Sequence, residues 1–290
     1  MKNYIIPTSS VKHLAKNILA KTKNFEVVFP DFSKDGRRYF PDGEVYMRIL
    51  KADQLRGKRV IVLHSGAPKP NEGLIELELI LQILKDNDVR PEIFFTYFPY
   101  GMQDEVFEKG ETNVAENLIE KLINYYKVKK IYTVDAHFGG RKWAEKYPIG
   151  NVSAAPILIK EAQKDFGKDI LFLSPDIGGA RRTKIAGMKK ERLDSYRVKM
   201  ISPKLNLKGE IVGIIDDLIK TGGTLIKTYQ ECKKSGAKRI IALVTHGVLP
   251  SGIQKIKRKY SRLYLTNTIK QKESNIDITD LILNTLLKHD

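Results

Sequence analysis

Apolar residues follow two spacings along this chain, and the two spacings alternate from one end to the other. Short unbroken apolar runs are typical of strands buried on both faces, and apolar residues three and four apart indicate amphipathic helices. The predicted strands are a short one after residue 4 and residues 59–64, 92–98, 130–134, 170–173, 211–215 and 240–244. The predicted helices are residues 11–19, 72–85, 113–126, 155–166, 223–234 and 276–287. This alternation predicts an α/β fold of mostly parallel sheets flanked by helices.

The chain has 290 residues, which is enough for two domains that each bury a core of their own. Proline, glycine and asparagine cluster near residue 150, so we expect one domain at residues 1–150 and another at 151–275. The last segment, 276–290, is expected to join the first domain, with an ordinary core helix as the alternative. Residues 128–137 and 237–246 share a basic start, an apolar run and a final histidine, which hints at a duplicated domain.

Lysine and arginine outnumber aspartate and glutamate by 51 to 34, which gives a net charge of +17 and favours anionic ligands. No basic run is interleaved with aromatic residues, so no nucleic-acid partner is predicted. No apolar stretch is long enough to span a membrane, so we expect a cytoplasmic protein without a membrane segment. The single cysteine, Cys232, excludes an intrachain disulfide and a cysteine-based zinc cluster.

The most informative motif lies where the apolar run 211–215 ends. Two adjacent aspartates follow it, and a Thr-Gly-Gly-Thr turn then opens the helix predicted at 223–234. Glycines let backbone N–H groups approach a phosphate, which a helix N-terminus also attracts, whereas a carboxylate accepts hydrogen bonds from sugar hydroxyls. The motif therefore predicts a ribose 5-phosphate site, with an ordinary aspartate-rich turn as the alternative. Its predicted ligands are Asp216, Asp217, Thr221, Gly222, Gly223 and Thr224.

This motif resembles the phosphoribosyl-binding motif that phosphoribosyltransferases share with ribose-phosphate pyrophosphokinases. Several further polar segments stand mostly at the ends of predicted strands, where open parallel sheets bind ligands. In their order and spacing they resemble ribose-phosphate pyrophosphokinases over nearly the whole chain, whereas phosphoribosyltransferases share only residues 216–224. These further segments are residues 40–44, 64–71, 97–104, 135–137, 174–179 and 265–269.

The resemblance implies two phosphoribosyltransferase-like domains and a defined reaction. ATP and ribose 5-phosphate give 5-phosphoribosyl 1-diphosphate and AMP, because the anomeric hydroxyl attacks the β-phosphorus and the β,γ-diphosphoryl group moves. The implied cofactor is Mg²⁺, with His137 and Asp176 as ligands, and the implied catalytic cations are Lys190 and Arg192. The implied ATP-binding residues are Phe40, Asp42, Glu44, Gln103, Asp104 and His137. The implied assembly is a homo-oligomer built from dimers, which in this family can extend to a hexamer.

Three features depart from the pattern of that family. Met102 and Glu105 stand where two cations are usual beside the nucleotide, and each lost charge-assisted contact costs about 1.5–3 kcal/mol. The segment 183–189 is shorter than in the family, and Lys220 stands where some members carry an acid, at a position that tolerates variation. The sequence therefore leaves three functions open: an active pyrophosphokinase, which we favour, a non-catalytic regulatory paralogue of the synthetase-associated type, and a phosphoribosyltransferase.

Overall fold

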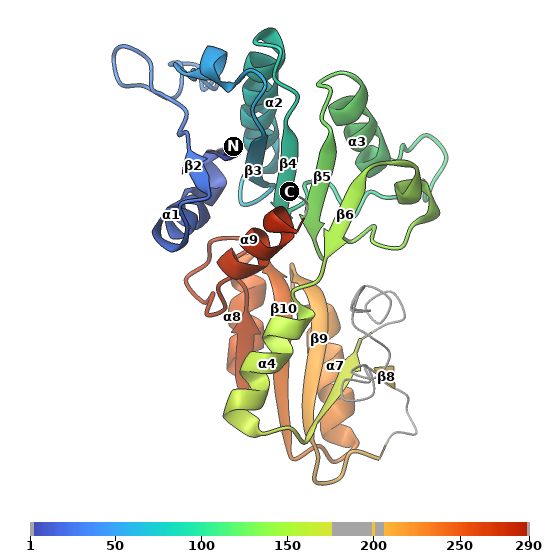
Figure 1. Ribbon diagram of the computed structural model, residues 1–290. Coiled ribbons are helices and arrows are strands. Elements are labelled where there is room, and N and C mark those ends of the chain that lie inside the picture. The colour runs from blue at the N-terminus through green and yellow to red at the C-terminus, as the bar shows by residue number, and fades with distance from the viewer. Residues whose placement is uncertain (1–2, 176–198, 201–205, 289–290) are drawn as a thin grey trace. The chain divides into compact units, whose positions relative to one another are not determined.

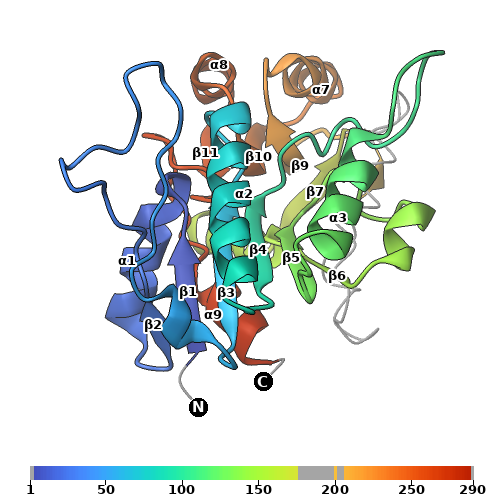
Figure 2. The same cartoon turned by 90° about the horizontal axis from the view of Figure 1, so that it is seen from above.

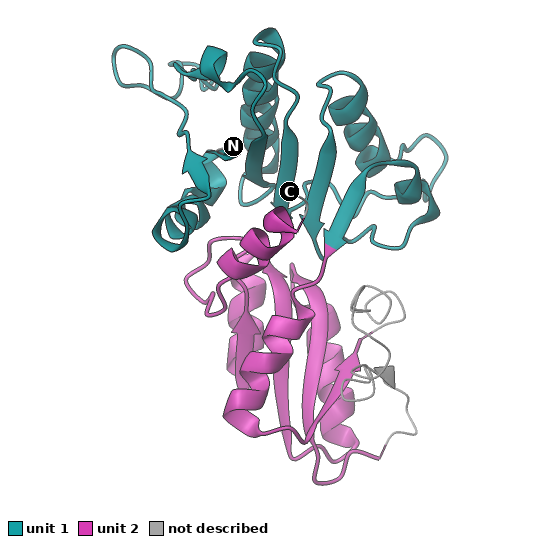
Figure 3. Cartoon of the chain, in the orientation of Figure 1, with its two compact units in different colours: residues 1–151 teal, residues 152–290 magenta. Residues whose placement is uncertain are grey.

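The computed structural model describes residues 3–175, 199–200 and 206–288 (Figure 1). The chain forms two compact units, residues 1–151 and residues 152–290 (Figure 3). Each unit contains one sheet with helices packed against it. No helix among the described residues combines the length and the apolar character needed to cross a bilayer.

The first unit alternates strands and helices. Its elements are β1 (Asn3–Pro7), α1 (Lys12–Lys21), β2 (Phe25–Val27), β3 (Val60–Ser65), α2 (Pro70–Asp86), β4 (Glu92–Tyr97), α3 (Val114–Asn124), β5 (Lys130–Val134) and β6 (Ile149–Val152), with short 3-10 turns η1 (Ser9–Val11), η2 (Ala52–Leu55) and η3 (Lys142–Lys146). The strand order is β2-β1-β3-β4-β5-β6. β1 pairs in parallel with β2 and β3, and the pairs β3–β4 and β4–β5 are also parallel.

The second unit repeats this alternation. Its elements are α4 (Ala155–Phe166), β7 (Ile170–Ser174), β8 (Lys199–Met200), β9 (Ile211–Ile219), α7 (Gly223–Lys234), β10 (Arg239–Gly247), α8 (Pro250–Lys259), β11 (Arg262–Leu265) and α9 (Thr279–Leu287). The strand order is β11-β10-β9-β7-β8, and every neighbouring pair is parallel. The predicted α/β class with parallel sheets flanked by helices is therefore confirmed.

The two sheets share one topology. In each unit the first strand lies between the second and the third, and the fourth and fifth follow on the same side, so β7 to β11 correspond to β1 to β5. The two similar segments, 128–137 and 237–246, contain β5 and β10, which occupy the fifth and the fourth place. The two segments therefore do not contain equivalent strands of the two units. Their likeness reflects a pattern that parallel strands have in common.

Helices cover both faces of the second sheet. Val212 and Ile214 of β9 pack with Leu225 of α7 and Ile253 of α8, whereas Ile215 packs on the opposite face with α4. Figure 2 shows α7 and α8 side by side on their face of the sheet. Residues 276–288 belong by their contacts to the second unit. The predicted packing of the last helix on the first domain stays a prediction.

One predicted strand boundary is wrong in a way that matters for the site. The strand predicted at 211–215 continues to Ile219, so both aspartates lie inside β9. The cause is the neighbouring strand β10, which is equally long and pairs with β9 as far as Gly247 opposite Ile219. Strand β7 is shorter, and its last pair with β9 joins Leu173 and Ile214. The aspartates therefore begin where β9 loses one of its two neighbours.

Candidate functional site

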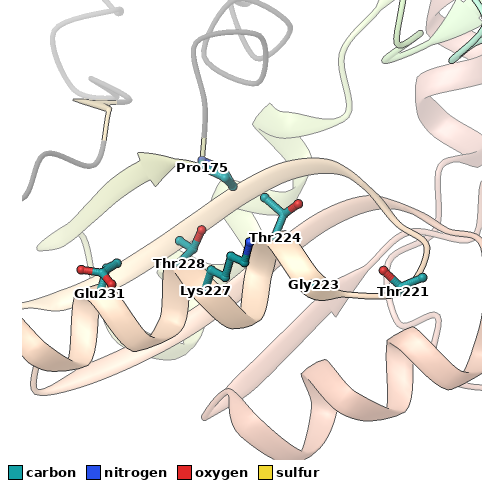
Figure 4. A pocket seen from close by; sticks show the side chains of 7 residues that line it. All are labelled: Pro175, Thr221, Gly223, Thr224, Lys227, Thr228 and Glu231. Atoms are coloured by element: carbon teal, nitrogen blue, oxygen red, sulfur yellow. The ribbon is translucent and has the colours of Figure 1, made fainter.

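A pocket of about 610 Å³ lies beside the turn between β9 and the start of α7 (Figure 4). This is the point where the chain order of the second sheet reverses, because β7 pairs with β8 on one side and with β9 on the other. Open α/β sheets bind ligands at such a switch point. The described lining residues are Pro175, Thr221, Gly223, Thr224, Lys227, Thr228 and Glu231.

The first turn of α7 offers backbone donors to this pocket. Gly222 is the N-cap of the helix, and as a glycine it has no side chain that could bond to the first helical N–H groups. Gly223 and Thr224 are exposed, and no acidic residue stands in the first turn to compete with an anion. Free N–H groups and the helix dipole together favour a phosphate at this position.

Glycines on two elements allow this turn to form. Gly222 has a φ of 78°, a left-handed conformation that glycine adopts without strain. Gly252 of α8 lies directly beneath the turn, where a Cβ atom would stand 1.9 Å from the carbonyl oxygen of Lys220. α8 therefore supports the turn formed by residues 220–224, the phosphate turn. Only a residue without a side chain fits at that contact.

The two predicted sugar ligands are nearly buried, with 7% exposure for Asp216 and 4% for Asp217. The backbone N–H of Asp217 donates to Oδ1 of Asp216 at 3.0 Å. Successive residues of a strand point to opposite faces, so the two carboxylates leave β9 in opposite directions. Neither aspartate is among the described lining residues of the pocket. Their binding to ribose hydroxyls stays a prediction.

Lys227 is a pocket residue that the sequence interpretation did not single out. Its side chain lies along α7 and points toward Thr224 (Figure 4). Helical side chains lean toward the helix N-terminus, so a lysine one turn into α7 covers the first turn. Its spacing of three residues from Thr224 was the available signal in the sequence.

The corresponding helix start in the first unit has different chemistry. α2 follows β3 as α7 follows β9, but it begins with Pro70, which has no N–H group, and it carries Glu72 in its first turn. Glu72 accepts hydrogen bonds from Lys69 at 2.8 Å and from the hydroxyl of Tyr39 at 2.6 Å. These two bonds lower the pKa of Glu72 and keep it ionised. An ionised carboxylate at this helix start opposes phosphate binding. Of these two corresponding helix starts, only that of α7 therefore suits a phosphate.

The turn after β4 carries the predicted ATP ligand Gln103. Tyr100 has a φ of 57°, and its carbonyl accepts from the N–H of Gln103 at 2.9 Å. The carbonyl of Gln103 in turn accepts from the N–H of Ala115 at 3.0 Å. These bonds fix the backbone, while the side chains of Met102 and Gln103 are exposed.

Arg141 joins this turn to the turn after β5. Its guanidinium donates to both carboxylate oxygens of Asp104, from Nε at 2.8 Å and from Nη2 at 3.3 Å, and to both oxygens of Glu105 at 2.8 Å. Hydrogen bonds to Glu105 and Asp104 raise the pKa of Arg141 above its ordinary value. The sequence interpretation missed Arg141 because its partners lie 36 and 37 residues away.

The predicted metal and ATP ligand His137 lies in the turn after β5 and is half-buried. Asp135 opens this turn with a φ of 38°, and the N–H of Ala136 donates to Oδ1 of Asn151 at 3.0 Å. Gly139 packs so closely against Asn151 that an added Cβ would stand 2.8 Å from its amide nitrogen. The turn that carries His137 is thus fixed on both sides.

The remaining predicted ATP ligands, Phe40, Asp42 and Glu44, lie in a tight hairpin of the first unit. Phe40 and Glu44 face each other across its tip, with the N–H of Phe40 donating to the carbonyl of Glu44 at 2.8 Å. Asp42 accepts from the N–H of Glu44 at 3.1 Å. All three residues are exposed, and Phe40 is 50% accessible.

Several predicted residues lie outside the described part of the chain. They are Asp176, Lys190 and Arg192, together with the shortened segment 183–189. Within the described ranges, no group of three or more His, Cys, Asp or Glu side chains could hold a metal ion.

Comparison with known proteins places the chain in a family. Residues 4–126 match the N-terminal domain of ribose phosphate pyrophosphokinase, and residues 157–280 match the phosphoribosyl transferase domain. The ribose-phosphate pyrophosphokinase of Pyrococcus furiosus is 32% identical over 96% of this chain and 98% of its own length. The chain belongs to the ribose-phosphate pyrophosphokinase family. The predicted family and its enzyme class, ATP-dependent diphosphotransferase, are confirmed.

Further relatives agree with this assignment. The ribose-phosphate pyrophosphokinase of Pyrococcus abyssi is 31% identical over 98% of both chains. The crystal structure of phosphoribosylpyrophosphate synthetase from Mycobacterium smegmatis covers the whole of both chains with a TM-score of 0.82 at 23% identity, which shows a shared fold. The match of residues 4–126 also separates this pyrophosphokinase from phosphoribosyltransferases, which were the third candidate.

Proposed function

We propose that this chain is an active ribose-phosphate diphosphokinase. It transfers the β,γ-diphosphoryl group of ATP to the anomeric hydroxyl of ribose 5-phosphate and releases AMP. Family membership supports the reaction, and the phosphate turn at the start of α7 is the observation that carries the proposal for this chain. Phosphoryl transfer of this kind depends on positioning and on neutralising charge, since little covalent chemistry is left to the protein.

The second unit binds the sugar phosphate in this proposal. The 5-phosphate takes hydrogen bonds from the N–H groups of Gly223 and Thr224 and from the hydroxyls of Thr221 and Thr224, and Lys227 adds a positive charge. The carboxylates of Asp216 and Asp217 accept the ribose hydroxyls, because an ionised carboxylate has only acceptor positions to offer. The predicted roles of these aspartates and of Gly222 stay predictions.

The first unit supplies the nucleotide side. Gln103 and His137 stand on turns at the carboxyl ends of two neighbouring parallel strands, β4 and β5, which is where such sheets bind ligands. The exposed hairpin tip with Phe40, Asp42 and Glu44 completes the ATP site of a neighbouring subunit in this proposal. That role requires the predicted homo-oligomer, which in this family is built from dimers and can extend to a hexamer.

Mg²⁺ is the cofactor in this proposal. Mg²⁺ keeps several waters and takes only one or two protein side chains when it binds together with phosphates. His137 in its fixed turn and Asp176 would hold it, and the ion would neutralise charge on the polyphosphate. Lys190 and Arg192 donate to the oxygens of the migrating group, and an arginine can bind two of them at once.

A second candidate function rests on two residues of the turn after β4, residues 98–105, which is the nucleotide turn of this proposal. Met102 is 38% exposed where the family usually has a cation, and Glu105 adds a carboxylate. A chain that binds ribose phosphate and regulates a catalytic partner would tolerate both. A cytoplasmic location and the lack of nucleic-acid partners stay predictions under either function.

Release of AMP tests the proposal. The purified chain is incubated with ATP, Mg²⁺ and ribose 5-phosphate, and AMP is measured by a coupled assay. We expect AMP to form only when the sugar phosphate is present and to fall to background in Lys190→Ala, which removes a predicted catalytic cation. Equal background signals in the wild type and Lys190→Ala would favour the regulatory function.

A further inference from the structure

We propose that Arg141 is a positioning residue that sets the geometry and charge of the nucleotide turn. The inference rests on the proposed function and deepens it, because Arg141 explains how an ATP site can contain Glu105 where a cation is usual in the family. Arg141 stands in the turn after β5, and its two partners stand in the turn after β4. One side chain therefore links the two turns that carry Gln103 and His137.

Burial shows which of the two contacts is the anchor. The side chain of Asp104 is 2% exposed, that of Glu105 is 43% exposed, and that of Arg141 is 39% exposed. A buried carboxylate without a partner is strongly unfavourable, whereas an exposed ion pair contributes little. Asp104 therefore needs Arg141, and the contact with Glu105 mainly neutralises its charge.

A second bond fixes the same point of the turn. The indole Nε1 of Trp143 donates to the backbone carbonyl of Asp104 at 3.0 Å. Trp143 packs on Phe138 with ring centroids 5.1 Å apart, and Phe138 packs on Phe98 at 5.0 Å. The turn of Asp104 is thus held through its side chain by Arg141 and through its backbone by Trp143, which packs against Phe138.

The guanidinium suits this task better than an ammonium would. Its planar fork donates to two carboxylates at once, whereas a lysine carries one point charge. Because the carboxylate of Asp104 is held by Arg141, Asp104 acts on the nucleotide through the position of the turn. Two carboxylates and one guanidinium leave this cluster negative, and removing Arg141 would leave both carboxylates without a cation beside a polyphosphate.

The test compares Arg141→Met with Lys142→Met, the exposed neighbouring cation. We expect Arg141→Met to raise the KM for ATP about tenfold, which corresponds to a loss of about 1.4 kcal/mol in ATP binding. The KM for ribose 5-phosphate should change less than twofold in both variants. Thermal unfolding of each variant checks that the fold is kept.

Further substitutions distinguish an effect of the charge of Arg141 on ATP binding from a loss of local structure. Glu105→Gln removes one of the two carboxylates, so in the Arg141→Met background it should recover part of the lost ATP affinity, and Arg141→Lys should recover less than half of it. A purely structural role predicts no recovery by Glu105→Gln and a parallel change in both KM values. That outcome, or equal KM values for ATP in Arg141→Met and Lys142→Met, would overturn the inference.

Titration calorimetry with Mg·ATP in the absence of sugar phosphate distinguishes the two proposals. A wild type that binds Mg·ATP but forms no AMP contradicts the proposed activity, while weaker binding by Arg141→Met would still support the role of Arg141. A wild type that binds no Mg·ATP overturns both. Equal affinities for Mg·ATP in the wild type and Arg141→Met overturn the inference alone.

Discussion

At the scale of single residues, the phosphate turn combines several weak preferences at one point. Gly222 supplies the left-handed backbone, Gly223 and Thr224 are exposed at the start of the helix, and Lys227 leans back over the same turn. These residues are contiguous or one helical turn apart, so local spacing was enough to predict most of them. Arg141 was not predictable in this way, because its contacts with Asp104 depend on the pairing of β4 with β5.

Lys227→Met tests the phosphate role of the lysine. We expect the KM for ribose 5-phosphate to rise about tenfold, because a charge-assisted contact of about 1.5–3 kcal/mol is lost. The KM for ATP should not change. Steady-state kinetics on this variant and on Lys233→Met, which lies near the far end of α7, provide the comparison. An unchanged KM for ribose 5-phosphate would remove Lys227 from the site.

At the scale of elements, the strongly periodic helices were predicted nearly to their ends, and α4 and α7 match their predicted ranges. α8 was not predicted, because Ile253 and Ile256 are its only large apolar residues and a basic run follows them, although both isoleucines and Gly252 are buried. Short edge strands such as β2 and β6 have too few residues to show a pattern. The role of α8 under the phosphate turn is visible only once the two elements are packed together.

Gly252→Ala sets two effects of opposite sign against each other. Alanine is favoured over glycine in a helix by about 1 kcal/mol. The added Cβ, however, would stand 1.9 Å from the carbonyl oxygen of Lys220, and overpacking of this kind costs about 1–3 kcal/mol. We expect lower thermal stability and a raised KM for ribose 5-phosphate, while Ser251→Ala, at an exposed position on the same helix, changes neither. A more stable Gly252→Ala with normal kinetics would show that α8 does not support the turn.

At the scale of the molecule, one strand order occurs in both sheets, but the two helix starts differ in chemistry. The start of α7 presents donors to an anion, whereas the start of α2 presents Pro70 and Glu72. The sequence predicted the fold class because alternating strands and helices leave few arrangements. It did not show which strands are equivalent, since this depends on the strand order within each sheet.

Stability of the whole chain should depend on pH through His64, which is fully buried on β3. Burial lowers the pKa of His64 to about 3 from an ordinary value of 6.5. Between these values the unfolded chain binds more protons than the folded one, so stability falls as the pH drops below about 6.5, by up to about 1.4 kcal/mol per pH unit. We expect His64→Asn to flatten this dependence between about pH 6.5 and 5. Urea unfolding at several pH values checks it, and identical pH slopes in both proteins would contradict it.

The most direct test of the central claim is a crystal structure of this chain with ribose 5-phosphate and a non-hydrolysable ATP analogue. The account predicts the 5-phosphate within hydrogen-bond distance of the backbone N–H groups of Gly223 and Thr224, with the ribose hydroxyls on Asp216 or Asp217. A sugar phosphate bound elsewhere, for example at the start of α2, would contradict it.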